Sequence, residues 1–200
     1  MNNNKKVIGI VGSYRKGGVV DKAISEILSA ASQNGAEVEK IYLVDKHIRF
    51  CTNCRECMQT PGAQRGKCIL DDDMEALLLN IESAYSLVIG APVNFNNITA
   101  ITRTFMERCV GYVYWPWGIK KPQMRTPGVG RKVVLVSASS APARMGRTFK
   151  DTLKALKYLA NMLGAHSIGQ LLIDDVKEDD MDIPEKMLKK AALLGRKLAR

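Results

Sequence analysis

The sequence predicts a three-layer α/β domain in which five parallel strands form one doubly wound sheet. Two observations support this fold class. Short apolar runs of strand length alternate five times with helical patterns along the chain. The first apolar run, residues 7–11, passes into a glycine-rich polar loop and then into a helix, which is the usual start of such a sheet. The chain of 200 residues has no internal repeat and no break in composition, so a single domain over residues 1–200 is expected.

The strands can be assigned in order from their patterns. Residues 7–11 (VIGIV) are almost purely apolar, as in a strand covered on both faces. Residues 37–43 alternate in polarity, so one face is partly wet and a position at the sheet edge is expected. The remaining strands are predicted at 87–91, 132–137 and 168–173.

The helices follow from apolar residues at helical spacing and from their flanking residues. The Asn34-Gly35 pair stops the first helix, and Asp71 to Asp73 are expected to cap the second. The predicted helices are residues 20–34, 74–81, 99–109, 148–163 and 184–199.

Composition and charge narrow the function classes. The formal net charge of +10 favours anionic ligands, but no nucleic-acid-binding module or basic–aromatic pattern is present. The N-terminus lacks the apolar core of a signal peptide, and no apolar run approaches the roughly 18 residues of a membrane span. We therefore expect a cytoplasmic protein with no membrane or nucleic-acid partner.

Three polar loops follow three of the predicted strands, at residues 12–20, 92–98 and 138–146. Because parallel strands end at the same edge of a sheet, where ligands usually bind, these loops are expected to form one crevice. The first loop offers the Ser13 hydroxyl, the Arg15 cation and the N–H groups of a helix N-terminus, all of which favour a phosphate. Its glycine spacing matches neither the dinucleotide nor the Walker motif. The sequence thus predicts a bound anionic cofactor.

Four segments, in this order, resemble the flavodoxin-like NAD(P)H-dependent FMN reductases, and among them the iron–sulfur flavoprotein branch. They are residues 12–18 (GSYRKGG), the cysteine segment leading into residues 71–74, residues 91–100 (APVNFNNITA), and Arg103 with residues 105–108. The resemblance implies a flavodoxin-like sheet with strand order 2-1-3-4-5 and a cysteine-rich insertion, residues 51–70, after the second strand. It also implies FMN as cofactor, NAD(P)H as co-substrate and a homodimer or homotetramer.

The resemblance assigns a part of the cofactor to each loop. Residues 13–20 would hold the FMN phosphate, residues 92–97 would lie along the isoalloxazine ring, and residues 138–146 would close the far side. Val19 and Val20 stand where the family often has a polar pair, so the other groups of that loop must supply more of the phosphate contacts. The flavin carries the chemistry, so no catalytic side chain is predicted. The candidate cofactor-binding residues are Ser13, Arg15, Gly18, Val19, Val20, Pro92, Val93, Asn94, Phe95, Asn96, Asn97, Ser139 and Ser140.

Four of the five cysteines form a C-x2-C-x2-C run followed by a fourth after ten residues. The resemblance implies a [4Fe–4S] cluster held by Cys51, Cys54, Cys57 and Cys68. The spacing leaves two other readings open: a structural zinc site, and free thiols or a disulfide with no metal. Cys109 lies on the apolar face of a predicted helix and is expected to be a packed core thiol.

Together these features predict an FMN-dependent oxidoreductase that takes hydride from NAD(P)H and passes electrons to a small-molecule or protein acceptor. The alternatives are an iron–sulfur flavoprotein electron carrier with a [4Fe–4S] cluster, and a thiol-based redox sensor. The basic residues of 120–132 are expected to attract nucleotide phosphates. The loop at 110–130, with Trp115 and Trp117, is expected to be an interface or flap loop.

Overall fold

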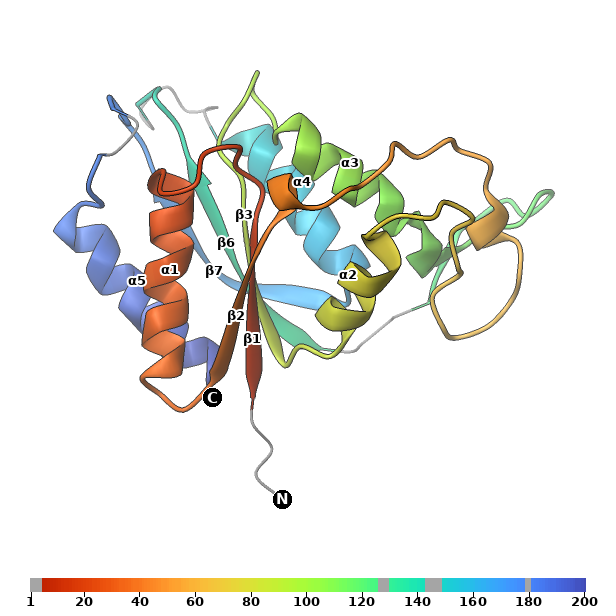
Figure 1. Cartoon of the computed structure of the whole chain (residues 1–200), viewed down its shortest axis with the longest axis horizontal. Helices are drawn as coiled ribbons and strands as arrows, with labels where there is room; N and C mark the ends of the chain where they lie inside the picture. The colour runs from red at the N-terminus through yellow and green to blue at the C-terminus, as the bar shows by residue number, and fades with distance from the viewer. Residues whose placement is uncertain (1–4, 126–129, 143–148, 179–180) are drawn as a thin grey trace.

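A computed structural model describes residues 5–125, 130–142, 149–178 and 181–200. Its centre is a five-stranded parallel sheet with the order β2-β1-β3-β6-β7 (Figure 1). Numbered within the sheet, this is the predicted order 2-1-3-4-5, and the expectation that the second strand lies at an edge is confirmed. The strands are β1 (Lys6–Val11), β2 (Glu37–Tyr42), β3 (Ser86–Gly90), β6 (Arg131–Ala138) and β7 (Ala165–Ile173).

Helices cover both faces of the sheet, which confirms the doubly wound architecture. One face is covered by α1 (Val19–Ser32) and α5 (Glu185–Leu198), on the left in Figure 1. The other face is covered by α2 (Met74–Glu82), α3 (Ala100–Arg108) and α4 (Lys150–Met162). Among the described residues, short 3-10 turns lie at Leu43–Asp45, Glu56–Met58 and Cys109–Tyr112.

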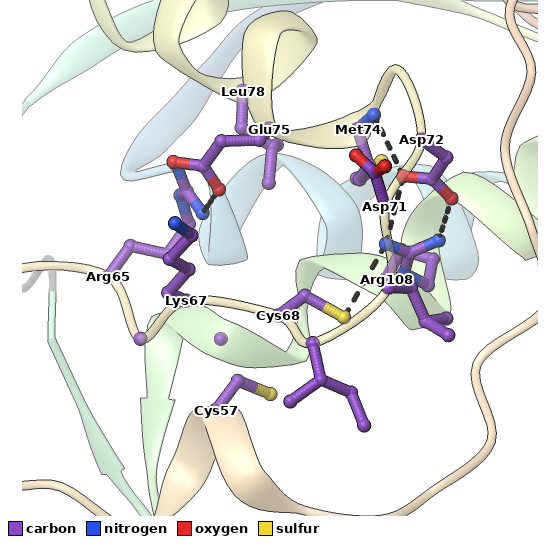
Figure 2. A pocket seen from close by; sticks show the side chains of 14 residues that line it. Cys57, Arg65, Lys67, Cys68, Asp71, Asp72, Met74, Glu75, Leu78 and Arg108 are labelled. Atoms are coloured by element: carbon purple, nitrogen blue, oxygen red, sulfur yellow. Dashed lines mark hydrogen bonds and ion pairs between the residues drawn. The ribbon is translucent and has the colours of Figure 1, made fainter.

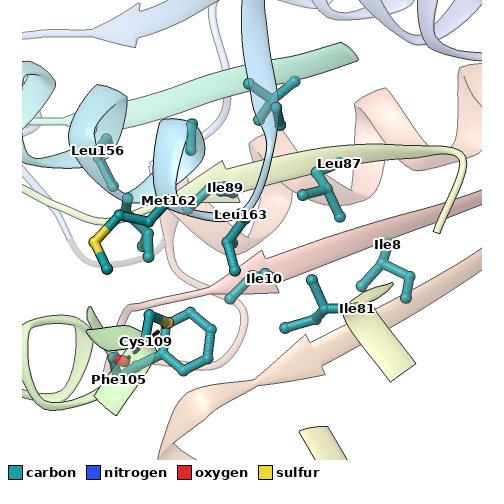
Figure 3. Packing of buried hydrophobic residues seen from close by; sticks show 14 of the residues in the cluster. Ile8, Ile10, Ile81, Leu87, Ile89, Phe105, Cys109, Leu156, Met162 and Leu163 are labelled. Carbon is teal, nitrogen blue, oxygen red and sulfur yellow. Dashed lines mark hydrogen bonds between the residues drawn. The ribbon is translucent and has the colours of Figure 1, made fainter. Parts of the chain in front are cut away.

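The side chains of the central strands alternate between two apolar layers, as the pleat of a strand requires. Val7 and Val11 pack towards α1 and α5, whereas Ile8 and Ile10 pack towards α2, α3 and α4. Figure 3 shows this second layer, in which Cys109 lies between the sheet and the helices. The Cys109 thiol is fully buried, so the expectation of a core thiol is confirmed, and burial raises its pKa.

Two features of the fold differ from the sequence-based expectations. β7 begins three residues before the expected strand, and its register with β6 shifts between Val133 and Val134, where Ile168 is the extra residue. A small antiparallel hairpin, β4 (Val113–Tyr114) and β5 (Gln123–Met124), lies in the 110–130 loop, where no strand was predicted. Strands of two residues are too short to produce a readable alternation of polarity.

The basic residues of 120–132 do not form a single phosphate-attracting surface. The expectation is wrong for Arg125, Arg131 and Lys132, whereas Lys120 and Lys121 are exposed and their role stays a prediction. Arg125 is buried, and its guanidinium donates to backbone carbonyls of the cysteine segment. Arg131 and Lys132 begin β6 and therefore lie at the opposite edge of the sheet from the loops that follow the strands. Arg131 donates to the carbonyls of Ile81 and Leu163. These charges satisfy buried backbone groups instead of facing a ligand.

Candidate functional site

A cavity of about 500 Å³ lies at the carboxyl edge of the sheet, within the range of about 300–1,000 Å³ usual for small-molecule sites. The loops after β1, β3, β6 and β7 all contribute to its wall, so the predicted convergence of loops is present. Its lining residues include ten of the thirteen predicted ones: Ser13, Arg15, Gly18, Val19, Val20, Pro92, Val93, Asn94, Ser139 and Ser140.

The other three predicted residues do not line this cavity. Phe95 and Asn96 have left-handed backbone conformations, with φ of 47° and 60°, and Asn94 and Asn97 pair as an antiparallel bridge on either side of them. This tight turn leaves the Phe95 side chain 99% exposed. Asn97 is engaged within the protein, because its Oδ1 accepts from the backbone N–H of Ile98 and from Arg103. Of residues 92–97, therefore, only Pro92, Val93 and Asn94 line the cavity.

Hydrogen-bond donors gather at the end of the cavity formed by the first loop. Gly18 precedes α1, whose first N–H groups, those of Val19 and Val20, have no acceptor within the helix. The buried Ser13 Oγ accepts from the N–H of Arg15 at 3.1 Å and keeps its own proton to donate. With the positive end of the helix dipole, this donor set suits a phosphate.

Hydrogen bonds to Gly12 fix the first loop against its neighbours. The Gly12 N–H donates to the Gly90 carbonyl at 2.7 Å, and the Gly12 carbonyl accepts from the hydroxyls of Thr99 and Thr102 at 2.6 and 3.2 Å. The Tyr14 hydroxyl in turn accepts from the backbone N–H of Ile101, in the first turn of α3. The loop and the N-terminus of α3 are thus held together.

Asp21 anchors the same loop from behind. Its carboxylate accepts from the Gly17 N–H at 2.7 Å, from Lys40 Nζ at 2.7 Å and from the Tyr42 hydroxyl. Burial raises the pKa of Asp21, but the hydrogen bonds from Lys40, Gly17 and Tyr42 outweigh burial and hold this pKa below the ordinary 3.8. Asp21 is therefore a buried anion that Lys40 neutralises.

Sequence reasoning missed the lining residues Tyr14, Thr99, Ala138, Val176, Lys177 and Glu178. Three of them belong to the loop after β7, which joins the wall because the Val176 N–H donates to the Ser139 carbonyl at 3.1 Å. The rule that ligands bind at the carboxyl ends of parallel strands could have found this loop. Part of the 138–146 loop, residues 143–146, lies outside the described residues.

The four clustered cysteines line a second, much smaller cavity of about 20 Å³. Cys51, Cys54, Cys57 and Cys68 all contribute to it, together with Arg108 at the end of α3. All four are free thiols, and Cys57 is buried. Burial and the three neighbouring cysteines raise the pKa of the Cys57 thiol to about 11. The fold therefore brings together the four residues proposed as cluster ligands from the sequence.

No group of three or more His, Cys, Asp or Glu side chains in the described ranges is placed to hold a metal ion. A single zinc ion needs its sulfur ligands close together, because each Zn–S bond is only about 2.3 Å long. A [4Fe–4S] cluster binds each cysteine to a different iron, so its sulfurs stand farther apart. Four cysteine thiols gathered around one cavity are the ligand set that a [4Fe–4S] cluster uses.

Arg125 and two glycines shape the cysteine segment. The buried Arg125 guanidinium donates to the carbonyls of Cys57, Thr60, Gly62 and Gln64. Gly66 lies so close to Cys57 that an added Cβ would collide with the Cys57 carbonyl, and the Gly66 N–H donates to the Gly111 carbonyl at 2.9 Å. In Figure 1 the segment lies on the right beside the β4–β5 hairpin.

The two tryptophans of the expected interface loop also contact the cysteine segment. The Arg55 guanidinium stacks on Trp115 and Trp117, 4.8 and 3.9 Å from their ring centres. The backbone N–H of Trp115 donates to the Met58 carbonyl. Neither tryptophan lines the larger cavity. Residues 126–129 of this loop are outside the described part of the chain.

The aspartates before α2 have other partners than a simple helix cap. Asp73 precedes the helix, but its carboxylate accepts from the His47 N–H at 2.7 Å. Asp72 instead reaches the helix, since its Oδ1 accepts from the Met74 N–H at 3.1 Å. Asp72 also pairs with Arg108. The aspartates thus join the segment that follows β2 to α2 and α3.

Comparison with known proteins identifies the family of this chain. The family model described as NADPH-dependent FMN reductase matches residues 5–176, which is most of the chain. The chain belongs to this family. As a member of the NADPH-dependent FMN reductases it is an oxidoreductase with FMN as its cofactor.

Individual relatives point to one branch of the NADPH-dependent FMN reductase family. An iron–sulfur flavoprotein of Archaeoglobus fulgidus is 28% identical over 194 residues, covering 97% of this chain and 79% of the relative. An iron–sulfur flavoprotein of Methanocaldococcus jannaschii is 35% identical over 103 residues, about half of each chain (52% and 51%). A Bacillus anthracis FMN-dependent NADH-azoreductase, solved in complex with FMN, has a TM-score of 0.65 at 17% identity and 97% coverage of both chains.

In the part of the chain that the structure describes, no helix is both long and apolar enough to cross a membrane.

Proposed function

We propose that this protein is an FMN-dependent oxidoreductase that is reduced by NAD(P)H and passes electrons on through a [4Fe–4S] cluster. The single observation that carries the proposal is the presence of two separate sites in one member of the FMN reductase family. One is the cavity of about 500 Å³ at the carboxyl edge of the sheet, and the other is the cavity lined by four cysteines.

Ser13, the N–H groups of Val19 and Val20, and Arg15 would bind the FMN phosphate. Pro92 and the residues after it would cover the flavin ring, with Asn94 and Ser139 as hydrogen-bonding groups at its polar edge. When bound, FMN accepts a hydride from a nicotinamide and releases electrons to an acceptor. The protein's share is to bind and orient the flavin and to leave one of its faces open.

The four cysteines would bind the cluster through their thiolates, and a [4Fe–4S] cluster supplies one-electron transfer. The electron acceptor is a small molecule or a protein. The proposal includes a homodimer or homotetramer in which the exposed Phe95 and Trp117 lie near the subunit contact, since large exposed aromatic side chains favour such positions.

The test is the absorption spectrum of protein purified without oxygen, with flavin and iron assays on the same sample. Resolved flavin bands with a broad shoulder and about four irons per chain, as a [4Fe–4S] cluster requires, are the expected result. Flavin without iron, even after anaerobic reconstitution, would leave the flavin oxidoreductase and reject the cluster. Failure to bind added FMN would reject the whole proposal.

Asp21→Asn is expected to weaken FMN binding about tenfold, because the loss of an ionic hydrogen-bonding partner frees Gly17 and leaves Lys40 without its counter-ion. The measurement is an equilibrium titration of flavin-free protein with FMN. The matched control is Glu26→Gln, an exposed acid on the same helix, which should bind FMN as the wild type does.

The same variant gives a pH prediction. The folded-state pKa of Asp21 lies below 3.8, so its contribution to the free energy of unfolding is complete above that pH and is lost as the pH falls through the lower folded-state value. Asp21→Asn should therefore lose stability at neutral pH and approach the wild type in acid. Equal stability differences at neutral and acid pH would contradict the ionised state of Asp21.

A further inference from the structure

Arg108, the last residue of α3, brings a buried cation to the cysteine site. Its side chain is only 1% exposed, and it lines the cavity of the four cysteines. Its guanidinium NH2 group donates to Cys68 Sγ at 3.4 Å, as Figure 2 shows. Cys68 therefore receives a hydrogen bond from a charged donor.

Asp72 holds this guanidinium in place. The two side chains pair through both carboxylate oxygens, and the Asp72 side chain is fully buried. Asp72 also accepts from the N–H groups of Arg49 and Met74 at 2.8 and 3.1 Å. Arg108 donates a further hydrogen bond to the Arg49 carbonyl. A bidentate pair with these extra bonds leaves the guanidinium little freedom to turn away from Cys68.

Stabilisation of the fold alone does not explain the buried Arg108–Asp72 ion pair. A buried ion pair often stabilises a fold no better than packed apolar residues would, because both ions lose their hydration. Here one donor is directed at a sulfur atom, and Arg108 Nε is buried with no partner among the described residues. Arg108 and Cys68 also line a third cavity, of about 340 Å³, which reaches α2 (Figure 2). Arg108 thus lines both cavities, as Cys57 and Cys68 do.

We propose that Arg108 is a positioning residue whose N–H···S hydrogen bond to Cys68 raises the reduction potential of the cluster bound there. The reason is electrostatic. Reduction adds one electron to the cluster and makes its sulfur ligands more negative, and a charged donor stabilises the more negative state more strongly. Partners of metal ligands in the surrounding shell commonly tune a metal site in this way. The inference rests on the cluster of the proposed function.

The test is a redox titration of the cluster, with mediator dyes and dithionite as the reductant, followed by electron paramagnetic resonance. Arg108→Lys keeps the positive charge beside Asp72 but lacks the planar donor that also reaches Cys68. Its cluster should be reduced with an equilibrium constant about tenfold smaller, which is a potential lower by about 59 mV for one electron.

Lys67→Met is the matched control. Lys67 is exposed and adjacent to Cys68 in the chain, so this change removes a nearby charge without removing the hydrogen bond. Its potential should stay much closer to that of the wild type. Arg108→Gln removes the positive charge and leaves the buried Asp72 carboxylate without its partner, so its potential should be at least as low as that of Arg108→Lys.

Each contrary outcome has its own meaning. Equal potentials in the wild type and Arg108→Lys, with iron retained in both, overturn the inference but not the cluster. A shift in Lys67→Met as large as that in Arg108→Lys also overturns it, since general charge would then be the cause. Loss of iron from both Arg108 variants assigns the arginine to cluster assembly and overturns the effect on potential. Wild-type protein that takes up no iron overturns the cluster together with the inference.

Discussion

Replacing Arg125 with alanine is expected to open the cysteine segment. The Arg125 side chain is the shared donor for the carbonyls of Cys57, Thr60, Gly62 and Gln64, at distances of 2.7–3.3 Å. Each hydrogen bond to a charged group contributes about 1.5–3 kcal/mol, and hydration of the freed carbonyls returns part of this. We expect a loss of about 2–4 kcal/mol in the free energy of unfolding of the segment.

Thiol reactivity in the metal-free protein measures this opening directly. In the wild type Cys57 is buried, and its pKa is raised to about 11, so it should react slowly with a thiol reagent at neutral pH. In Arg125→Ala the Cys57 thiol should react at least tenfold faster. A tenfold change corresponds to a loss of only about 1.4 kcal/mol in the free energy of opening the segment. The control is Lys121→Ala. Lys121 is exposed and lies between β4 and β5, so this variant should leave the rate unchanged. An unchanged rate in Arg125→Ala would show that other contacts close the segment.

Replacing Gly12 with alanine is expected to have the largest effect on the flavin site. An added Cβ would collide with the Thr102 hydroxyl and would stand 3.0 Å from the Gly90 carbonyl. The backbone cannot move aside easily, because Gly12 donates to Gly90 and accepts from Thr99 and Thr102. We expect a loss of about 3 kcal/mol or more in the free energy of unfolding, as overpacking of a rigid site produces.

The FMN affinity of Gly12→Ala should fall together with its stability, because the displaced loop carries Ser13 and leads into α1. Chemical denaturation and an FMN titration measure the two effects. Gly35→Ala is the control: Gly35 has φ of 85° and open space around it, so alanine should cost only about 1–2 kcal/mol of backbone strain and leave FMN binding intact. Wild-type affinity in Gly12→Ala would contradict a fixed first loop.

The strands could be predicted because apolar runs report burial directly, whereas the strand order followed from the family resemblance. Residues 7–11 lie on the interior strand β1 and those at 37–43 on or just after the edge strand β2, as their different polarity indicates. The gathering of the four cysteines could also be expected, since short gaps keep the first three on one loop. The hairpin of β4 and β5 could not be predicted, because two residues carry no periodic signal.

At the candidate sites, the burial of charged residues and the geometry of turns could not be predicted from the sequence. Arg125 looks in sequence like a surface cation, yet it is buried, because a residue's charge does not reveal whether carbonyl groups surround it. Phe95 looks like a cover for the flavin, but its backbone at φ of 47° directs the ring to solvent. Arg108 and Asp72 are 36 residues apart, and only the folded chain brings them to Cys68.

One helix touches both candidate redox sites. Tyr14, in the wall of the larger cavity, bonds to the first turn of α3, and Arg108 at the other end of α3 lines the cysteine cavity. Nine residues of α-helix span about 13 Å and resist bending and stretching. The α3 helix therefore keeps the two candidate sites at a fixed separation. Electrons that pass between the two sites of one subunit would therefore cross the same distance at every turnover, and no hinge motion would be needed to bring the sites together.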